Sequence, residues 1–196
     1  MYSIKSRSDS LVCTNYGTWK GLVRYALAQG QWLAGGLDDV VCPDLSRVER
    51  LVFVCLGNIN RSCFAEAVAK RMGATTASFG LSTTTGAPAF SQALITARQF
   101  QLELDTHRAT DMTDHQARPG DLLLAMEVRH VRRLQKCAPT SGTIALLGGW
   151  GRPQRLHLHD PHTLSPQYFQ TCFSIIESAT RQLVLEWQRQ RGVLPR

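Results

Sequence analysis

The feature that most constrains the fold is an apolar run followed directly by a polar loop and an alanine-rich stretch. Residues 51–54, Leu-Val-Phe-Val, form a short continuous apolar run of the kind found in buried parallel strands. A polar loop at 55–62 follows, and residues 63–72 contain good helix formers before Gly73, a residue type that often ends helices. This order predicts a buried strand, a loop and a helix.

The same alternation continues toward the C-terminal part of the chain. We expect further strands at 74–79, 121–126 and 143–147, and helices at 91–100, 128–136 and 167–190. Strands that alternate with helices form a parallel sheet covered by helices on both faces. The sequence therefore predicts an α/β domain over 48–196, built on a four-stranded parallel sheet.

A change in composition near residues 41–46 separates this domain from an N-terminal extension, residues 1–47. Within the extension, residues 18–34 have helical spacing of apolar side chains, with Tyr25, Trp32 and Leu33 on one face. This pattern predicts a helical extension that packs on the domain. The alternative is a homodimer contact through the extension, or a docking surface for a kinase or substrate. Its basic residues are too few to anchor a protein to a membrane.

Composition and charge exclude several classes of protein. A chain of 196 residues with 43% hydrophobic and 19% charged residues has the balance of a globular protein with a sizeable core. No apolar run reaches the roughly 18 residues that a membrane span needs, and the first residues lack the apolar core of a secretory signal, so we expect a cytoplasmic protein. The net charge of +7 favours anionic partners, but it is spread along the chain, so nucleic acid is not expected as a partner.

The cysteines do not indicate a metal site or a disulfide framework. The chain has six of them and no Cys-x-x-Cys pair, and it is long enough to fold without covalent staples. We therefore expect no metal and no cofactor, with most cysteines buried as small apolar residues and one of them reactive.

The loop after the first strand has the features of an oxyanion site. Ligands of parallel sheets bind at the carboxyl ends of strands, where backbone N–H groups and a helix N-terminus converge. Gly57 and Asn58 tolerate the tight backbone that such a nest needs, and Arg61 can bind two phosphate oxygens with its fork of N–H groups. Cys55 begins the loop, where this positive field favours the thiolate, and Ser62 can donate a hydrogen bond to its sulfur.

These residues carry a resemblance to a known family. The segment VCLGNINRS followed by FAEAVAKR resembles the active-site signature of the low-molecular-weight protein tyrosine phosphatases. The resemblance extends over about 50–187 and includes Ser78, the His107 region and the His-Asp-Pro at 159–161. It implies the phosphotyrosine phosphatase I-like fold and a metal-independent phosphomonoester hydrolase that works through a cysteinyl-phosphate.

The resemblance also implies roles for individual residues. Phosphoryl transfer to a thiolate needs an acid for the leaving group and then a base for water, and Asp160 matches the family's acid, aimed by Pro161. The implied catalytic residues are Cys55, Arg61 and Asp160, and the implied phosphate-binding residues are Leu56, Gly57, Asn58, Ile59, Asn60 and Ser62. Ser78 and His107 match a supporting hydrogen-bond network. We expect the nearby His157, His159 and His162 to be solvated loop residues.

The sequence departs from the family pattern at several positions. Asn60 stands where the family usually has a second cysteine that protects the nucleophile from overoxidation, so we expect less reversible inactivation by peroxide unless Cys63 substitutes. Thr84 replaces an aromatic residue that often walls the pocket, and His162 replaces the tyrosine of Asp-Pro-Tyr. Ile59 stands where the arginine phosphatases typically have Thr, which argues against that branch of the family. The changes at Thr84 and His162 predict a shallow pocket that accepts varied aryl phosphates.

Two other functions fit parts of the pattern. An arsenate reductase shares this fold and loop, but it needs a downstream pair of closely spaced cysteines, and Cys137 and Cys172 are far apart in sequence. A phosphate-binding adaptor without turnover needs neither Cys55 nor Asp160. We therefore expect a protein-tyrosine phosphatase whose substrate is a phosphotyrosine protein or another aryl phosphate; the resemblance points to a bacterial tyrosine kinase.

Overall fold

The fold is built on a small parallel sheet. The computed structural model describes residues 3–41, 43–137 and 142–193, with side chains from residue 10 onward. The four strands are β1 (Arg50–Cys55), β2 (Thr76–Gly80), β3 (Asp121–Ala125) and β4 (Thr143–Leu146), in the order β2-β1-β3-β4, and every pairing is parallel. The predicted four-stranded parallel sheet is thus confirmed, and β1, which bears Cys55 at its carboxyl end, lies inside it.

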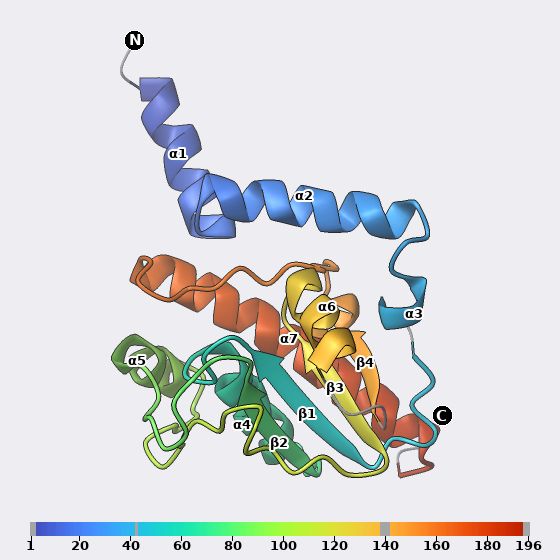
Figure 1. The fold of residues 1–196 in the computed structure, drawn as a ribbon. Coiled ribbons are helices and arrows are strands. Elements are labelled where there is room, and N and C mark those ends of the chain that lie inside the picture. Colours follow the sequence, from blue (N-terminus) through green and yellow to red (C-terminus); the bar gives the residue numbers. More distant parts are fainter. Residues whose placement is uncertain (1–2, 42, 138–141, 194–196) are drawn as a thin grey trace.

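Helices surround this sheet (Figure 1). They are α1 (Ser3–Tyr16), α2 (Trp19–Leu33), α3 (Asp38–Val41), α4 (Arg61–Arg71), α5 (Ser91–Gln99), α6 (Val128–Cys137), the 3-10 turn η1 (Leu147–Trp150) and α7 (Pro166–Gln190). The predicted helices and strands of the sheet domain are all present, with ends that shift by two residues or fewer. The α1, α3 and η1 elements were not predicted.

The alternation of side chains along β1 divides the core in two. Leu51, Phe53 and Cys55 belong to the larger apolar cluster with residues of α4, α5 and α7. Val52 and Val54 belong to the second cluster, which contains residues of α2, α3 and α6. Both faces of the sheet are therefore covered by helices, as a sheet without a solvated face requires.

The first two helices lie on the α6 side of the molecule. In Figure 1, α2 runs across the top, above α6 and the loop that precedes α7, and α1 projects from its end. Ala28 is buried in the second core cluster, and Trp32 and Tyr25 are half-buried. The prediction that Leu33 shares their packed face is wrong, because Leu33 is 78% exposed at the end of the helix. The composition change at 41–46 includes Cys42, which lies outside the described residues.

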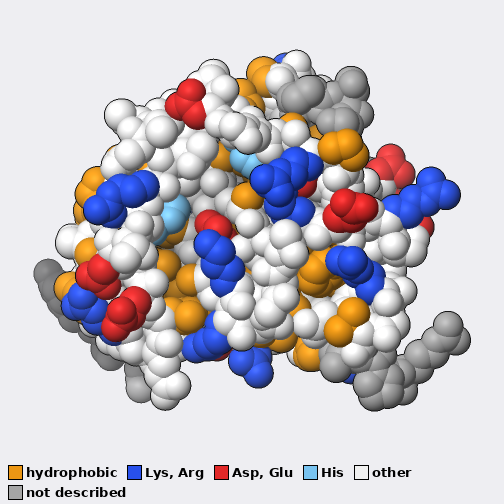
Figure 2. All heavy atoms as spheres, turned by 90° about the horizontal axis from the view of Figure 1, so that it is seen from below, with side chains coloured by type: hydrophobic (Ala, Val, Ile, Leu, Met, Phe, Trp, Pro, Cys, Tyr) orange, Lys and Arg blue, Asp and Glu red, His pale blue; other side chains and the backbone are white. Residues whose placement is uncertain are grey.

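Charges on the surface are mixed in sign. On the face shown in Figure 2, lysine and arginine side chains are interspersed with acidic ones rather than gathered in one block. No helix in the described part of the chain is long and apolar enough to cross a bilayer.

Candidate active site

The loop between β1 and α4 curls around the sulfur of Cys55. Cys55 ends β1 and is only 2% exposed, and α4 begins at Arg61. The backbone N–H of Asn58 donates to Cys55 Sγ over 3.2 Å, and Ser62 Oγ lies 3.0 Å from the same sulfur. Asn58 has φ = +52°, in the left-handed region that asparagine tolerates better than most residues. The loop thus points an amide and a hydroxyl at the sulfur.

The side chain of Asn58 holds the loop in this shape. Its Nδ2 donates to Ser62 Oγ over 2.9 Å and to Ser78 Oγ on β2 over 2.8 Å, while its Oδ1 accepts from the backbone N–H of Thr110 at 2.9 Å. Ser78 Oγ donates onward to Glu66 Oε2 on α4, over 2.6 Å. One buried amide therefore ties the loop to β2, α4 and the 110 region.

His107 supports the same loop from outside. Its Nε2 lies 2.7 Å from the backbone carbonyl oxygen of Asn58. A carbonyl oxygen only accepts, so Nε2 carries the proton in this contact. Burial lowers the pKa of His107, which keeps the ring neutral near neutral pH.

Arg61 lies under the loop with no exposed surface. Its Nη1 donates to Glu127 Oε1 and to the carbonyl oxygen of Leu158, each over 2.7 Å, and its Nη2 donates to Asp160 Oδ2 over 2.6 Å. Burial alone would lower the pKa of Arg61, but the charges of Asp160, Glu127 and Cys55 outweigh it and raise the pKa. Its Nε has no hydrogen-bond acceptor among the residues that the structure describes, so that N–H is available to an oxyanion.

Asp160 closes the site at the surface. Its side chain is 27% exposed, and Oδ1 accepts from the backbone N–H of His162 at 3.2 Å. Asp160 therefore joins the buried arginine to the entrance of a pocket of about 170 Å³. The pocket is lined by Cys55, Leu56, Gly57, Ile59, Asn60, Ser82, Asp160 and His162.

The three neighbouring histidines differ from the expectation that all are solvated. His157 is buried, and burial is the main cause that lowers its pKa to about 4. His159 is half-buried, and its Nε2 lies 3.1 Å from Thr18 Oγ1 at the start of α2. Only His162 is exposed; its ring packs edge-to-face against Phe90 with centroids 4.6 Å apart, so an aromatic surface borders the pocket after all.

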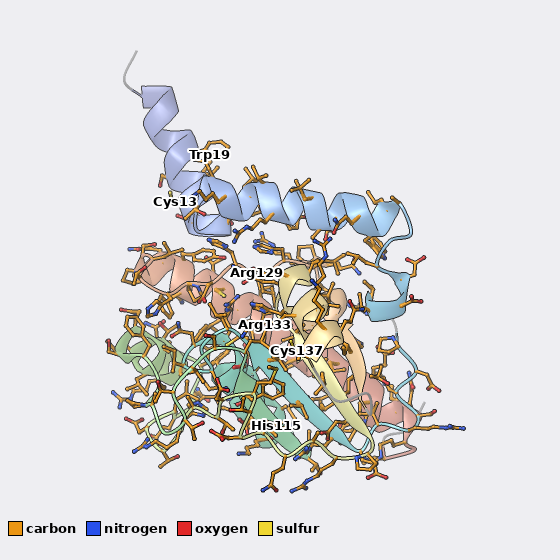
Figure 3. All side chains as sticks on the ribbon, in the orientation of Figure 1. Cys13, Trp19, His115, Arg129, Arg133 and Cys137 are labelled. Atoms are coloured by element: carbon orange, nitrogen blue, oxygen red, sulfur yellow. The ribbon has the colours of Figure 1, made fainter. Side chains whose placement is uncertain are left out.

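Glu127 is a site residue that the sequence analysis missed. It follows β3, and besides Arg61 it pairs with Arg129, whose Nε lies 2.7 Å from Glu127 Oε2. Figure 3 shows Arg129 between α2 and the sheet. His130 and His157 approach the same carboxylate at 3.6 and 3.7 Å. A signal existed, because an acidic residue after a buried parallel strand comes out at the same sheet edge as Cys55.

Comparisons with known proteins identify this arrangement. The family model "Low molecular weight phosphotyrosine protein phosphatase" matches residues 50–193. The chain belongs to this phosphatase family. The low molecular weight protein-tyrosine-phosphatase Wzb of Salmonella typhimurium is 32% identical over 146 residues, which are 73% of this chain and 97% of Wzb.

Solved structures agree with this membership. The crystal structure of the Erwinia amylovora tyrosine phosphatase AmsI superposes with a TM-score of 0.62 at 28% identity, covering 76% of this chain and 95% of AmsI. Vibrio vulnificus Wzb in complex with benzylphosphonate gives a TM-score of 0.62 at 25% identity, with 70% of this chain and 98% of that chain covered. The fold class and the family predicted from the sequence are therefore confirmed.

The residues predicted from the phosphatase resemblance come together in space. The nucleophile candidate, the acid candidate and four loop residues line one pocket, Arg61 is bonded to the acid candidate, and the supporting side chains are hydrogen-bonded to the loop at Asn58. Thr84 is exposed and is not among the lining residues of this pocket. Asn60 lines the pocket, with its Nδ2 3.4 Å from His162 Nδ1.

A larger cavity lies elsewhere and does not include the Cys55 sulfur. It measures about 520 Å³ and is bordered by the supporting residues Glu66, Ser78 and His107. Its lining is mostly polar.

The remaining described cysteines do not form pairs. Cys13 on α1 and Cys137 at the end of α6 are exposed and far apart in Figure 3, and Cys63 and Cys172 are buried free thiols. The described residues therefore contain no closely spaced pair of thiols of the kind that an arsenate reductase uses to resolve its intermediate. An arsenate reductase is not favoured.

Proposed function

We propose that this protein hydrolyses phosphotyrosine and related aryl phosphates through a phosphoryl intermediate on Cys55. The proposal rests on one arrangement. Cys55 Sγ accepts a hydrogen bond from the backbone N–H of Asn58 over 3.2 Å, and Cys55 and Asp160 line the same pocket. The Asp160 carboxylate lies 2.6 Å from the Arg61 guanidinium. A nucleophile and a proton carrier thus border one small cavity, and the buried Arg61 cation is bonded to the proton carrier. The benzylphosphonate bound by the Vibrio relative, an aryl phosphate analogue, supports the same substrate class.

In the first step the Cys55 thiolate attacks phosphorus, and the bond between phosphorus and the phenolic oxygen breaks. The electron pair leaves with that oxygen, which takes a proton from Asp160. The loop amides and Arg61 bind the equatorial phosphoryl oxygens, where charge is greatest in the transition state. Ser62 Oγ, at 3.0 Å, stabilises the thiolate before attack.

In the second step water attacks the phosphorus of the cysteinyl-phosphate. Asp160, now a carboxylate, takes a proton from this water as the bond between phosphorus and sulfur breaks. Inorganic phosphate leaves and the thiolate returns to its contacts with Asn58 and Ser62. The two steps restore Asp160 to its starting proton state.

The pocket supports an aryl group as the leaving group. Leu56 and Ile59 supply apolar contacts and His162 a flat ring beside the sulfur. With Thr84 outside this pocket, we propose that it is shallow and accepts varied aryl phosphates. A bacterial tyrosine kinase is our proposed protein substrate, in the cytoplasm, and a homodimer through residues 1–47 stays a prediction.

The test is hydrolysis of p-nitrophenyl phosphate by the full chain and its variants. Wild type should turn over, Cys55→Ser should be inactive, and Asp160→Asn should be slowed about 100-fold or more, because hydrolysis of the cysteinyl-phosphate loses its base. Cys137→Ser and Asp105→Asn, which change an exposed thiol and an exposed carboxylate, are the matched controls and should retain activity. Vanadate binding without turnover in wild type would instead identify a phosphate-binding adaptor.

A further inference from the structure

The segment that leads into Asp160 is held by the corner between α1 and α2 and by α2 itself. Arg155 Nη1 donates to the carbonyl oxygen of Asn15 over 2.7 Å, and the backbone N–H of Leu156 donates to Gln29 Oε1 over 3.3 Å. Thr18 Oγ1 meets His159 Nε2 at 3.1 Å. These three contacts come from residues outside the phosphatase family match at 50–193. The extension thus touches residues 155, 156 and 159, and Asp160 is next in the chain.

Two glycines allow this close approach. Gly17 has φ = +76°, and a Cβ on it would lie 2.6 Å from the Tyr168 ring. A Cβ on Gly21 would lie 2.9 Å from the His159 ring and 2.1 Å from the carbonyl oxygen of Tyr16. Any side chain at these two positions would push the corner away from His159 and the start of α7. This close packing therefore requires glycine at both positions.

The opposite side of the same segment is fixed to the active site. The backbone N–H of Leu158 donates to the carbonyl oxygen of Met126 over 3.0 Å, and the carbonyl oxygen of Leu158 accepts from Arg61. The carbonyl oxygen of His159 accepts from the hydroxyl of Tyr168 over 3.2 Å. His159 is therefore held through its backbone by α7, and its ring contacts Thr18 at Nε2 and, at 3.4 Å, His157 at Nδ1, with Asp160 immediately after it.

We propose that Thr18 is a positioning residue for Asp160: its hydroxyl holds the His159 ring, and this contact keeps the acid's carboxyl at the mouth of the Cys55 pocket. The inference rests on the proposed function, because it requires Asp160 to be the general acid. Thr18 touches neither substrate nor sulfur, and it acts only through His159. The extension then helps to position the general acid and does not merely cover the domain.

Thr18 also caps α2, because its Oγ1 accepts from the backbone N–H of Gly21 at 2.9 Å. Thr18→Val loses both contacts, whereas Thr18→Ser keeps a hydroxyl for both. His159→Phe leaves the cap intact and removes the Thr18 contact from the other side. It also removes the 3.4 Å contact between His159 Nδ1 and His157 Nε2, so a loss shared with Thr18→Val identifies the Thr18 contact as the cause. Thr14→Val is the matched control, since Thr14 donates only to the carbonyl oxygen of Ser10 within α1.

The experiment measures kcat/KM of the full-length variants for aryl phosphates whose leaving phenols range from p-nitrophenol to unsubstituted phenol. A displaced acid harms poor leaving groups most, because p-nitrophenolate leaves with little proton transfer. We expect Thr18→Val and His159→Phe to lose about tenfold with phenyl phosphate and less than about threefold with p-nitrophenyl phosphate. Thr18→Ser and Thr14→Val should follow wild type, and the double variant should be no worse than either single variant.

A uniform loss over all leaving groups would overturn the positioning role, because unfolding of part of the sample lowers every rate equally. Equal impairment of Thr18→Ser and Thr18→Val, or additive losses in the double variant, would also overturn it. Asp160→Asn is the reference that separates the two claims. If Asp160→Asn shows the leaving-group effect and Thr18→Val and His159→Phe do not, the inference is wrong while the proposed acid stands; if Asp160→Asn lacks it, the acid assignment itself is wrong.

Discussion

Arg61 and Glu127 form an ion pair in which neither side chain has any exposed surface, with 2.7 Å between Nη1 and Oε1. Burial alone would raise the pKa of Glu127, but the adjacent Arg61 charge outweighs it and holds that pKa well below its usual range. The guanidinium is consequently fixed from behind, while its Nε remains available for an oxyanion. Glu127, which follows β3, thus orients Arg61, which follows the loop after β1.

Glu127→Gln should therefore weaken both oxyanion binding and stability. The amide keeps the shape but leaves the buried Arg61 charge less compensated, which typically costs about 3 kcal/mol when one partner of a buried pair is removed. We expect a loss of unfolding free energy of that order in urea and at least about tenfold weaker vanadate binding. Glu103→Gln, in an exposed loop, is the control. An unchanged vanadate affinity in Glu127→Gln would contradict the orienting role.

Replacement of Asn58 by glycine or by alanine should reduce activity. Asn58→Gly tolerates φ = +52° but removes the side-chain bonds to Ser62, Ser78 and Thr110, whereas Asn58→Ala adds backbone strain. We expect kcat/KM for p-nitrophenyl phosphate to fall about tenfold or more in both variants, and stability to fall further in the alanine variant. If Asn58→Gly is as active as wild type, the hydrogen bonds of the Asn58 side chain are dispensable.

His157 should make the protein less stable in mild acid. Its pKa in the folded protein is about 4, below the ordinary value of 6.5, so the unfolded chain binds a proton at pH 5 that the folded chain does not. Stability is therefore lost as pH falls below 6.5, by about 1–2 kcal/mol at pH 5 from this residue. His157→Gln should show a shallower decline in unfolding free energy over this range, and exposed His162→Gln should not. Parallel curves for wild type and His157→Gln would refute the assignment.

Peroxide should inactivate the enzyme with poor recovery, because Asn60 cannot form a disulfide with Cys55. Cys63 does not substitute well: burial raises its pKa far above the ordinary value, and its Sγ donates to the carbonyl oxygen of Asn60 over 3.1 Å. Asn60→Cys should increase the activity recovered by thiol after peroxide treatment, whereas Cys63→Ser should leave recovery unchanged. Full recovery in wild type that persists in Cys63→Ser would contradict this prediction.

The sheet and the loop could be predicted because their signals are local. The apolar run at 51–54, the spacing from Cys55 to Arg61 and the alanine-rich start of α4 lie within about twenty consecutive residues. The α1 helix was missed because its polar sequence lacks helical periodicity, and it contacts α2 and α7 in the fold. Leu33 was misplaced because periodicity indicates a face but not where the neighbouring structure ends.

The partners of the site residues could not be predicted in the same way. Glu127 meets Arg61 across 66 positions of sequence, and Thr18 meets His159 across 141. Such contacts depend on how whole elements pack. The histidines near Asp160 have the composition of a solvated loop, but His157 is buried and lines a cavity together with residues of α2 and α6.

The most direct test of the proposed mechanism is a search for a phosphoryl group on Cys55. Asp160→Asn is mixed with p-nitrophenyl phosphate, quenched within a turnover, digested and analysed by mass spectrometry. Loss of the base in Asp160→Asn slows hydrolysis of the intermediate, so we expect one phosphoryl group on the peptide that contains Cys55. Rapid p-nitrophenol release without any phosphoryl group on that cysteine, or with one on another residue, would contradict the thiolate mechanism.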